Sequence, residues 1–432
     1  MKRALVLVLA LALSLTACAN PKVTVVVVWH SLAGARERAL QVLVDQWNAA
    51  NRTGSVVVAE RRDAALMRNA MLDGKARGAE PALTLATPSM AALLFRNGLA
   101  RQLDDYVALS GDQGGFSPED RADLFDFVFR SGRTREGRTI GIGYGGAARA
   151  MFYNRDWLRS EGLDGPPRDL DRLATVCGRA SDPLKGTQCL ISQADAATYA
   201  DWLYMFGGSL ATDEGVQTYA PQFLSQNSIT ATARFGIFAN AGLIRRALNA
   251  EQPRDEFAAG RSLFSFDWTD QLADYRSAVK DGANFEWGIA SPPTPAGAGQ
   301  VGYQGWVWTL TPGDAEREDA AWRFVRWMLD EPQSAVWAAR TRELPVRVTA
   351  VNRLRSREGL DAASADALIR LARQAVATPV ISGWGCIETG LGDAMAEVFE
   401  GRPPSDALAR AQAFALTQAS QFCVSRALSA TP

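Results

Sequence analysis

Val23-Thr24-Val25-Val26-Val27-Val28-Trp29 is the stretch that decides the fold class of this chain. A nearly continuous run of β-branched residues is typical of a central parallel strand whose two faces are both covered. A helix is expected after it, because apolar residues recur there at helical spacing: Leu40, Leu43, Val44 and Trp47. The first folded unit is therefore a strand followed by a helix.

The same order of strand and helix is repeated twice downstream. Residues 56–58 and 82–86 are short apolar runs that predict strands, and helical spacing returns at 65–72 and after Ser89. Alternation of this kind indicates βαβ units around a parallel sheet. Residues 23–86 thus predict one α/β lobe.

Two extended segments further along predict connections to a second region. Residues 139–146 are glycine-rich, and residues 287–295 form an apolar run that prolines end. Each is interpreted as a strand crossing between two lobes, with a second α/β region at about 153–285. The glycine spacing fits no nucleotide-binding fingerprint. A plain loop of small residues is the alternative for the glycine-rich segment.

The composition is that of an ordinary globular protein with a large core. The chain has 432 residues, 47% hydrophobic and 22% charged, enough for two to three domains. A formal net charge of -1 argues against a nucleic-acid-binding protein, which would show a strong basic surplus. His30 is the one histidine in the sequence, which excludes any metal site built from several histidines. We expect no metal and no cofactor.

The N-terminal sequence has the features of a secretion signal. Met1-Lys2-Arg3 is basic, and an apolar stretch at 4–13 follows that is too short to span a bilayer, which takes about 20 residues. Leu15-Thr16-Ala17-Cys18 resembles the cleavage box of bacterial lipoproteins, in which the signal is removed before the cysteine and lipid is attached to it. We expect a signal peptide at 1–17 and a lipidated anchor with a linker at 18–22. The alternative is an ordinary secretory signal with a chance cysteine.

The remaining cysteines fit an exported protein with disulfide bonds. Four are left when Cys18 is set aside: Cys177, Cys189, Cys386 and Cys423. An even number predicts two disulfides, for which three pairings exist. We favour Cys177 with Cys189 and Cys386 with Cys423, because the members of each pair lie closest in the sequence. A zinc site is not expected, since the spacings fit no zinc pattern.

Four segments, in order, resemble a known family. They are Val28-Trp29-His30-Ser31 with residues 45–51, Phe152-Tyr153-Asn154-Arg155-Asp156 with the residues up to Pro167, Phe257-Ala258-Ala259-Gly260-Arg261, and Ala321-Trp322-Arg323-Phe324 with Leu344-Pro345-Val346-Arg347. The set is similar to the extracellular solute-binding proteins of bacterial ABC importers, in the group that binds carbohydrates. Together the segments cover most of the mature chain.

The resemblance implies a two-lobed α/β fold of the periplasmic-binding-protein type (type II), with a ligand cleft between discontinuous lobes. Residues 23–143 with about 290–348 form the first lobe, and residues 144–289 with about 349–432 form the second. Hinge closure around ligand is the expected mechanism. The implied partners are a carbohydrate ligand, the permease subunits of the importer and the membrane that holds the lipid on Cys18. The protein is expected to be an extracytoplasmic monomer.

The expected ligand site combines aromatic rings, on which the C–H faces of a sugar pack, with polar groups that bond its hydroxyls. By resemblance, we expect Trp268 to stack on the sugar and Asp267 to accept its hydroxyls; the alternative for Asp267 is a helix N-cap. Trp384, in a segment that we expect to be a loop, and Tyr199, beside Trp202, are further candidates. Packing is the alternative for Tyr199.

Additional candidates follow from their position along the predicted strands. Ligands in open α/β sheets lie at the carboxyl ends of strands, which is where His30, Ser31 and Thr87 stand. Tyr144 lies in the glycine-rich crossing segment, and Trp306 lies in a later predicted strand. A structural role is the alternative for His30, and a core position is the alternative for Trp306.

The expected function is capture of a sugar or oligosaccharide and its delivery to a permease, without catalysis. One alternative is binding of glycerol-3-phosphate or its diesters, since Trp29-His30-Ser31 resembles that subgroup. Its members carry an arginine where this chain has residues 380–384 and a carboxylate where it has Ala86-Thr87, and these differences favour a neutral ligand. The sequence is also compatible with an anchored glycoside hydrolase that uses Asp267 and Glu388, and with a sensor subunit for a membrane receptor.

Overall fold

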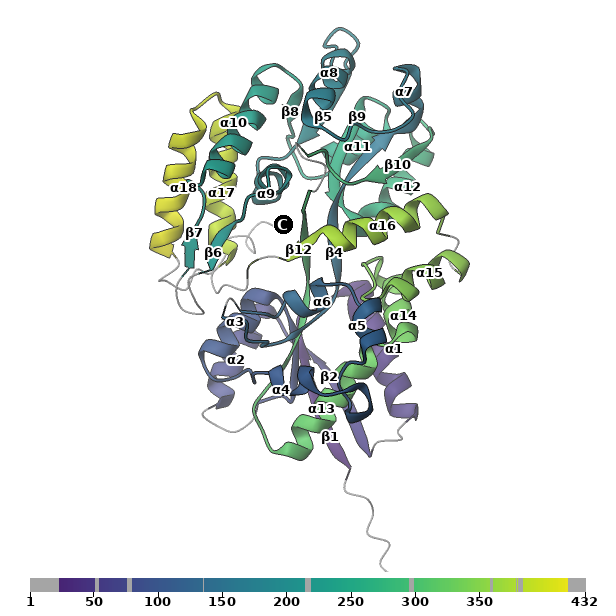
Figure 1. Ribbon diagram of the computed structural model, residues 1–432, viewed down its shortest axis with the longest axis vertical. Coiled ribbons are helices and arrows are strands. Elements are labelled where there is room, and N and C mark those ends of the chain that lie inside the picture. The colour runs from purple at the N-terminus through teal and green to yellow at the C-terminus, as the bar shows by residue number, and fades with distance from the viewer. Residues whose placement is uncertain are drawn as a thin grey trace, which may run out of the picture.

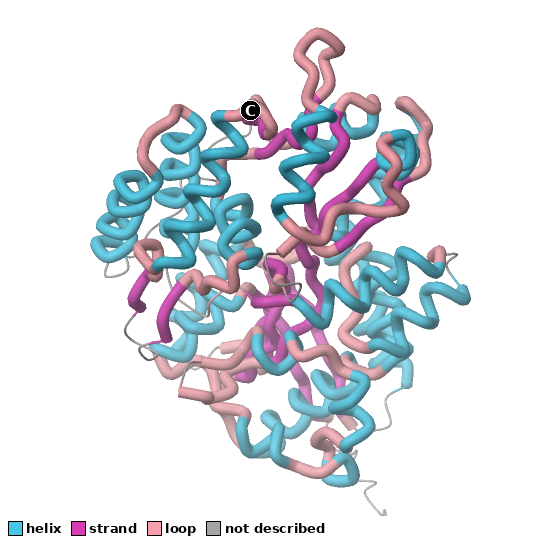
Figure 2. The backbone as a smooth tube through the Cα atoms, turned by 45° about the horizontal axis from the view of Figure 1, so that its top comes forward, coloured by secondary structure: helices cyan, strands magenta, loops and turns pink. Residues whose placement is uncertain are grey.

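The computed structural model describes residues 23–50, 54–75, 80–134, 136–213, 219–294, 299–357, 360–377, 379 and 384–418. Within them, one mixed sheet runs in the strand order β2-β1-β3-β11-β4-β9-β5-β8, with β10 paired to β4 and β12 to β11. Figure 1 shows two lobes, one above the other, that share this sheet, and Figure 2 shows helices packed around the strands. The two-lobed α/β fold is confirmed.

The described strands are β1 Thr24–His30, β2 Ser55–Arg61, β3 Leu83–Ala86, β4 Ile142–Asn154, β5 Gln188–Ser192, β6 Ala211–Asp213, β7 Tyr219–Pro221, β8 Ile244–Arg246, β9 Ser262–Trp268, β10 Trp287–Ala290, β11 Val301–Leu310 and β12 Ala375–Ala377. The described helices are α1 Gly34–Ala50, α2 Ala64–Lys75, α3 Pro88–Arg96, α4 Asp104–Ala108, α5 Pro118–Asp123, α6 Phe127–Arg130, α7 Arg155–Ser160, α8 Leu170–Ala180, α9 Ala196–Met205, α10 Gln226–Asn240, α11 Gln252–Ala258, α12 Leu272–Asp281, α13 Ala315–Met328, α14 Glu331–Thr341, α15 Val348–Arg357, α16 Ala362–Gln374, α17 Trp384–Phe399 and α18 Pro404–Gln418. Two short 3₁₀ helices are η1 Gly111–Gln113 and η2 Thr269–Gln271.

The lower lobe of Figure 1 is built on β1, which lies between β2 and β3 and runs parallel to both. The β-branched run is therefore the parallel strand that the sequence predicts. Its burial differs from the prediction in one respect: Val26 and Val28 are buried, but Val25 is 52% exposed. One face of the first half of β1 is open, so only the second half is enclosed on both faces.

Strand β4 connects the two lobes. Up to Ala148 it pairs antiparallel with β11, and from Arg149 onward it pairs with β9 and β10. The glycine-rich segment is thus a crossing strand, as predicted, and the loop alternative is wrong. The segment starting at Trp287 forms β10, which pairs with the second half of β4, so its interpretation as a crossing strand is wrong. The strand that crosses beside β4 is β11, because it pairs with β3 at one end and with β12 at the other.

The crossing point requires glycine. Gly145 and Gly146 in β4 have φ values of 60° and 127°, and they lie opposite an irregularity in β11 between Gln304 and Trp306. A Cβ on Gly146 would come within 2.3 Å of the carbonyl oxygen of Gln304. Side chains disfavour both φ values, and here they would also collide with the neighbouring strand. Glycine therefore permits the two backbones to approach where they pass between the lobes.

Two large apolar cores stabilise the molecule. The first core is formed by side chains of β1, β3, α1 and α13 and includes Leu40 and Phe324. The second core is formed by side chains of α8, α9, α10 and α17 and includes Trp202 and Leu391. The first core also reaches Phe152 at the far end of β4. The crossing strand is therefore buried along its whole length, which fixes it in position between the two lobes.

One of the predicted disulfides is present: Cys177 in α8 is bonded to Cys189 in β5. Cys423 and residues 1–22, with Cys18, lie outside the described residues. The bond between Cys386 and Cys423, the signal peptide and the lipid anchor therefore stay predictions, as do the lobe boundaries. Among the described residues, no helix has the length and apolar character that a membrane crossing needs.

Candidate functional site

A cavity of about 220 Å³ lies where the crossing strands pass between the lobes. Its walls come from the start of α1, the end of β3, the middle of β4 and β11, the helix η2 and the loop after α14. The lining residues are Arg36, Thr87, Gly146, Ala147, Asp270, Gln304, Gly305, Trp306 and Glu343. Elements from distant parts of the chain thus converge on one cavity.

The Glu343 carboxylate accepts four hydrogen bonds at this cavity. Its Oε1 accepts hydrogen bonds from Nε of Arg36 and, at 3.0 Å, from Nε1 of Trp306. Its Oε2 accepts from Nε1 of Trp337 at 2.8 Å and from the backbone N–H of Gly146 at 3.1 Å. Glu343 is only 4% exposed. A buried carboxylate needs such compensation, because a charge without partners is costly in the interior.

Arg36 links the first lobe to the predicted second lobe. Its Nη2 atom lies 3.0 Å from Oδ2 of Asp270 in η2. Burial alone would lower the pKa of Arg36, but the carboxylates of Glu343 and Asp270 raise it above its usual value. Burial also raises the pKa of Asp270. A second ion pair, between Arg342 and Asp274, joins the same two regions at the surface.

Trp268 and Asp267 lie at the end of β9, beside a buried ion pair. Arg149 in β4 donates to Asp201 in α9, with Nη2 2.6 Å from Oδ2, and its guanidinium carbon lies 5.0 Å from the centroid of the Trp268 ring. Asp267 accepts the hydroxyl of Tyr275 at 3.2 Å and the backbone N–H of Trp268 at 2.7 Å. Burial raises the pKa of Asp267. The N-cap alternative for Asp267 is wrong, since η2 has no side-chain cap and begins after Trp268.

Two of the residues that we predict from sequence line the cavity. Thr87 caps the N-terminus of α3, where its hydroxyl oxygen accepts the N–H of Met90, and Trp306 is half-buried in β11. His30 ends β1 and is 3% exposed, and its Nδ1 has no hydrogen-bond partner in the described part of the chain. Burial lowers the pKa of His30. Ser31 follows it and is half-buried.

Three more of the predicted residues are packed in the interior and do not line the cavity. The Tyr144 side chain is fully buried, and the hydroxyl of Tyr199 lies 2.6 Å from Oγ of Ser228 in the second core. Trp384 is the first residue of α17, not part of a loop as we expected, and its Nε1 donates to Glu388 at 2.8 Å. Their contact with a ligand stays a prediction.

Four polar residues of the cavity were missed by the sequence analysis: Arg36, Asp270, Gln304 and Glu343. Two of them lie next to sequence features from which they could have been predicted. Arg36 lies in the first turn of the helix after the β1 strand end, and Glu343 directly precedes Leu344-Pro345-Val346-Arg347, one of the segments that carry the family resemblance. Asp270 and Gln304 had no comparable signal.

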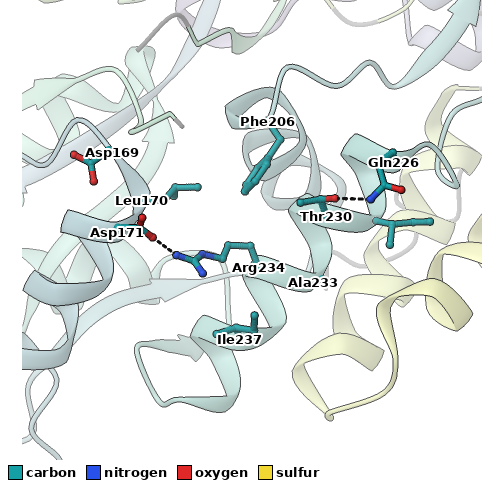
Figure 3. Close-up of a pocket in the computed structure, with 10 residues that line it drawn as sticks. Asp169, Leu170, Asp171, Phe206, Gln226, Thr230, Ala233, Arg234 and Ile237 are labelled. Atoms are coloured by element: carbon teal, nitrogen blue, oxygen red, sulfur yellow. Dashed lines mark hydrogen bonds and ion pairs between the residues drawn. The ribbon is translucent and has the colours of Figure 1, made fainter. Parts of the chain in front are cut away.

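A second cavity, of about 650 Å³, lies between α8 and α10 (Figure 3). It contains exposed Ile237, and an ion pair between Arg234 and Asp171 lies on one side of it. None of our predicted ligand residues lines this cavity. In the described part of the chain, no group of three or more His, Cys, Asp or Glu side chains is placed to hold a metal ion.

Comparison with known proteins agrees with this architecture. The family model of bacterial extracellular solute-binding proteins matches residues 43–363. A protein of Brucella abortus strain 2308, described as a binding protein, is 24% identical over 322 residues, which is 71% of this chain and 75% of the Brucella protein.

Solved structures share the fold over nearly the whole chain. The sugar-binding protein MalE of Xanthomonas citri has a TM-score of 0.77 at 18% identity, covering 90% of this chain and 96% of its own. The cyclic alpha-maltosyl-1,6-maltose binding protein of Arthrobacter globiformis has a TM-score of 0.73 at 18% identity, covering 90% and 97%. Since the family model spans most of the sequence and these structures share its two-lobed fold, the chain belongs to the bacterial extracellular solute-binding protein family.

Proposed function

We propose that this protein captures a neutral sugar or oligosaccharide between its lobes and delivers it to the permease of an ABC importer. The observation that carries the proposal is the cavity at the crossing strands, where the Trp306 ring lies beside the Arg36–Asp270 pair. It is supported by solved relatives, among them a cyclo/maltodextrin-binding protein complexed with maltotetraose, which has a TM-score of 0.74.

The chemistry of the walls suits a polyhydroxy ligand. Trp306 lines the cavity and is half-buried, and the guanidinium carbon of Arg36 lies 5.9 Å from the centroid of its ring. Trp268 is also half-buried but does not line this cavity. Aromatic rings pack against the C–H faces of a sugar, and Arg36 and Asp270 offer donors and acceptors to its hydroxyls. Lobe closure would bring further groups of both lobes onto the ligand.

The charges favour a neutral ligand over glycerol-3-phosphate. Among the described residues that line the cavity, the charged side chains are one guanidinium, Arg36, and two carboxylates, Asp270 and Glu343. Arg36 is paired with both carboxylates. An anionic ligand would have to compete with them for the guanidinium, and it would meet the remaining negative charge.

A role without catalysis is part of the proposal. A glycosidase needs two carboxylates poised on either side of a bond. Neither Asp267 nor Glu388, the two carboxylates that a hydrolase would use here, lines the cavity. We further propose that lipid on Cys18 anchors the protein outside the cytoplasm as a monomer, because tethering raises its effective concentration near the permease.

The proposal is tested by a thermal-shift screen of monosaccharides, oligosaccharides including maltotetraose, glycerol-3-phosphate and its diesters. A bound sugar should raise Tm, since ligand adds RT ln(1 + [L]/Kd) to stability. A phosphate ester as the sole hit would overturn the neutral class. Hydrolysis of the bound sugar by purified protein would overturn the absence of catalysis.

A substitution then tests the site. Trp306→Ala should weaken sugar affinity by about tenfold, because an aromatic contact contributes roughly 1.5 kcal/mol. Trp327→Ala is the matched control, since Trp327 is also half-buried but packs on Trp47 in the first core, away from the cavity. The control should lower Tm without changing Kd. Equal affinity in the Trp306→Ala variant and wild type would remove Trp306 from the site.

A further inference from the structure

We propose that Glu343 is a positioning residue of the ligand site, which holds Trp306 and Arg36 in place against the crossing strand β4. The identity of the ligand rests on the proposed function, but the positioning role does not. The carboxylate would set the geometry of the cavity walls without touching the ligand itself.

The hydrogen bonds of Glu343 show why it would act through neighbouring residues. A carboxylate offers about four acceptor positions, and four N–H groups occupy them in the structure, two on each oxygen. With these positions filled and the residue buried, no acceptor position is left for a sugar hydroxyl. Two of the four donors, Arg36 and Trp306, themselves line the cavity.

The remaining two donors tie the carboxylate to the crossing point. Trp337 is fully buried, and Gly146 belongs to the segment of β4 that passes between the lobes. A Cβ on the neighbouring Gly145 would lie 2.5 Å from Oε2 of Glu343 and 2.4 Å from Nε1 of Trp337. The carboxylate thus sits so close to the backbone that the sequence needs glycine there.

These hydrogen bonds link two side chains that line the cavity, Trp306 and Arg36, to the segment of β4 that passes between the lobes. Trp306 is bonded to one carboxylate oxygen and the Gly146 backbone to the other, so a shift of either strand displaces the shared acceptor. If Glu343 had a purely structural role, its loss would lower the stability of the protein and leave the mobility of the Trp306 side chain unchanged. A positioning role predicts that Trp306 itself becomes mobile.

Glu343→Gln keeps the size of the side chain but does not by itself separate the two roles. The amide places an NH₂ group where one oxygen stood, and that NH₂ faces N–H donors with which it forms no bond. In one orientation of the amide Trp306 and Arg36 lose their acceptor, and in the other Trp337 and Gly146 do. Glu343→Leu, which offers no acceptor in either orientation, is therefore the variant that decides. The readout is solvent exchange of the Trp306 indole N–H, followed by NMR in ¹⁵N-labelled protein and assigned by its absence in Trp306→Phe.

We expect the Trp306 indole to exchange at least tenfold faster in Glu343→Leu than in wild type, and the Kd for maltotetraose to rise about tenfold. Asp120→Asn is the matched control. Asp120 is another largely buried carboxylate of the first lobe, bonded by Arg326 and Arg347, and it does not line this cavity. Its loss should lower Tm and leave both the Trp306 exchange and the Kd as in wild type.

Unchanged exchange of the Trp306 indole in a folded Glu343→Leu protein overturns the proposal, and so does equal acceleration in the Asp120→Asn control. If Glu343→Leu does not fold, Trp337→Phe decides, since Trp337 bonds the same carboxylate and does not line the cavity. It should speed exchange of the Trp306 indole severalfold, and unchanged exchange counts against the proposal. Failure of wild type to bind any saccharide would contradict the proposed function, while the exchange rates would still decide the role of Glu343.

Discussion

Arg36→Met and Asp270→Asn, made singly and together, measure the ion pair that spans the cavity. Each substitution removes a charge and keeps most of the side-chain volume. Because Arg36 also bonds Glu343, the single variant reports more than one contact. The double-mutant cycle isolates the coupling between Arg36 and Asp270, since the Glu343 term is common to both legs.

The expected size of the coupling follows from the distance and the exposure of the pair. The two charges are 3.0 Å apart, and their side chains are 36% and 11% exposed. At an effective dielectric constant of 20 the gross attraction is roughly 5 kcal/mol, but exposed pairs retain only about 0.2–1 kcal/mol after solvation and entropy. For a pair with one partly exposed partner we expect about 1 kcal/mol, which changes the equilibrium between bonded and separated states about fivefold.

Urea unfolding of the four proteins at pH 7 gives the coupling, and X-ray scattering reports whether the lobes separate when the pair is lost. The coupling should shrink in 1 M NaCl because salt screens the exposed side. It should also fall in acid. Burial raises the pKa of Asp270 above its usual value of 3.8, so protonation removes the pair at a higher pH than for an ordinary aspartate.

A control pair fixes the baseline. Arg159 and Glu286 are 2.8 Å apart but both more than half exposed, and their cycle should give less than about 0.5 kcal/mol. A coupling below about 0.3 kcal/mol for Arg36 and Asp270, or one no larger than the control, would refute the reasoning. So would an unchanged scattering profile together with unchanged stability.

Three further predictions concern stability. Burial lowers the pKa of His30 below 6.5, so the unfolded chain binds the proton more readily and stability falls as pH drops below 6.5, by at most about 1.4 kcal/mol per pH unit. In His30→Gln the free energy of unfolding, measured in urea, should depend less on pH between pH 7 and pH 5 than in wild type. An equal pH dependence in the variant would contradict this. Replacing Cys177 and Cys189 by Ala should cost about 3 kcal/mol for a loop of this size in the chain-entropy model; a loss under about 1 kcal/mol by the same assay would contradict it. For Asp120, burial would raise the pKa, but Arg347 and Arg326 lower it below 3.8. The stabilisation from ionised Asp120 is thus present above pH 3.8, and it is lost as the pH falls through the lowered pKa of Asp120. Asp120→Asn should cost about 2 kcal/mol at pH 7, less than a fully buried pair because Asp120 is partly exposed, and no difference in urea midpoint would count against it.

The strand and helix order of the first lobe could be predicted because its signals are local. The apolar side chains of α1, Leu40, Leu43, Val44 and Trp47, are buried as their spacing predicts. The short apolar runs became β2 and β3, with parallel neighbours. Periodicity within a dozen residues carries this information, and each element buries the face that the pattern indicates.

Trp384 shows where local composition misleads. Glycine on both sides and a preceding serine favour a loop, yet the residue opens α17 and its ring packs into the second core at 7% exposure. Burial of a large aromatic side chain outweighs the helix penalty of about 1 kcal/mol for a neighbouring glycine. That gain depends on partners far away in the sequence, so a short window could not reveal it.

The cavity was only partly predictable for a related reason. Strand β4 is buried along its entire length, so no alternation of polar and apolar residues marks the face that Tyr144 presents. Glu343 finds its donors at Arg36, Gly146, Trp306 and Trp337. These positions are scattered over the chain and follow no spacing rule. Tertiary contact alone brings them together.

The place of β11 in the sheet has a consequence for the order in which the molecule can be assembled. β3 has β11 as its outer neighbour, with Leu83 facing Leu310, although β11 starts only at Val301. Until synthesis reaches that point, β1, β2 and β3 present an open edge, and unpaired edges invite association with foreign chains. Contacts of such long sequence separation slow folding. A nascent chain therefore cannot complete the sheet of the first lobe until most of the chain has been synthesised.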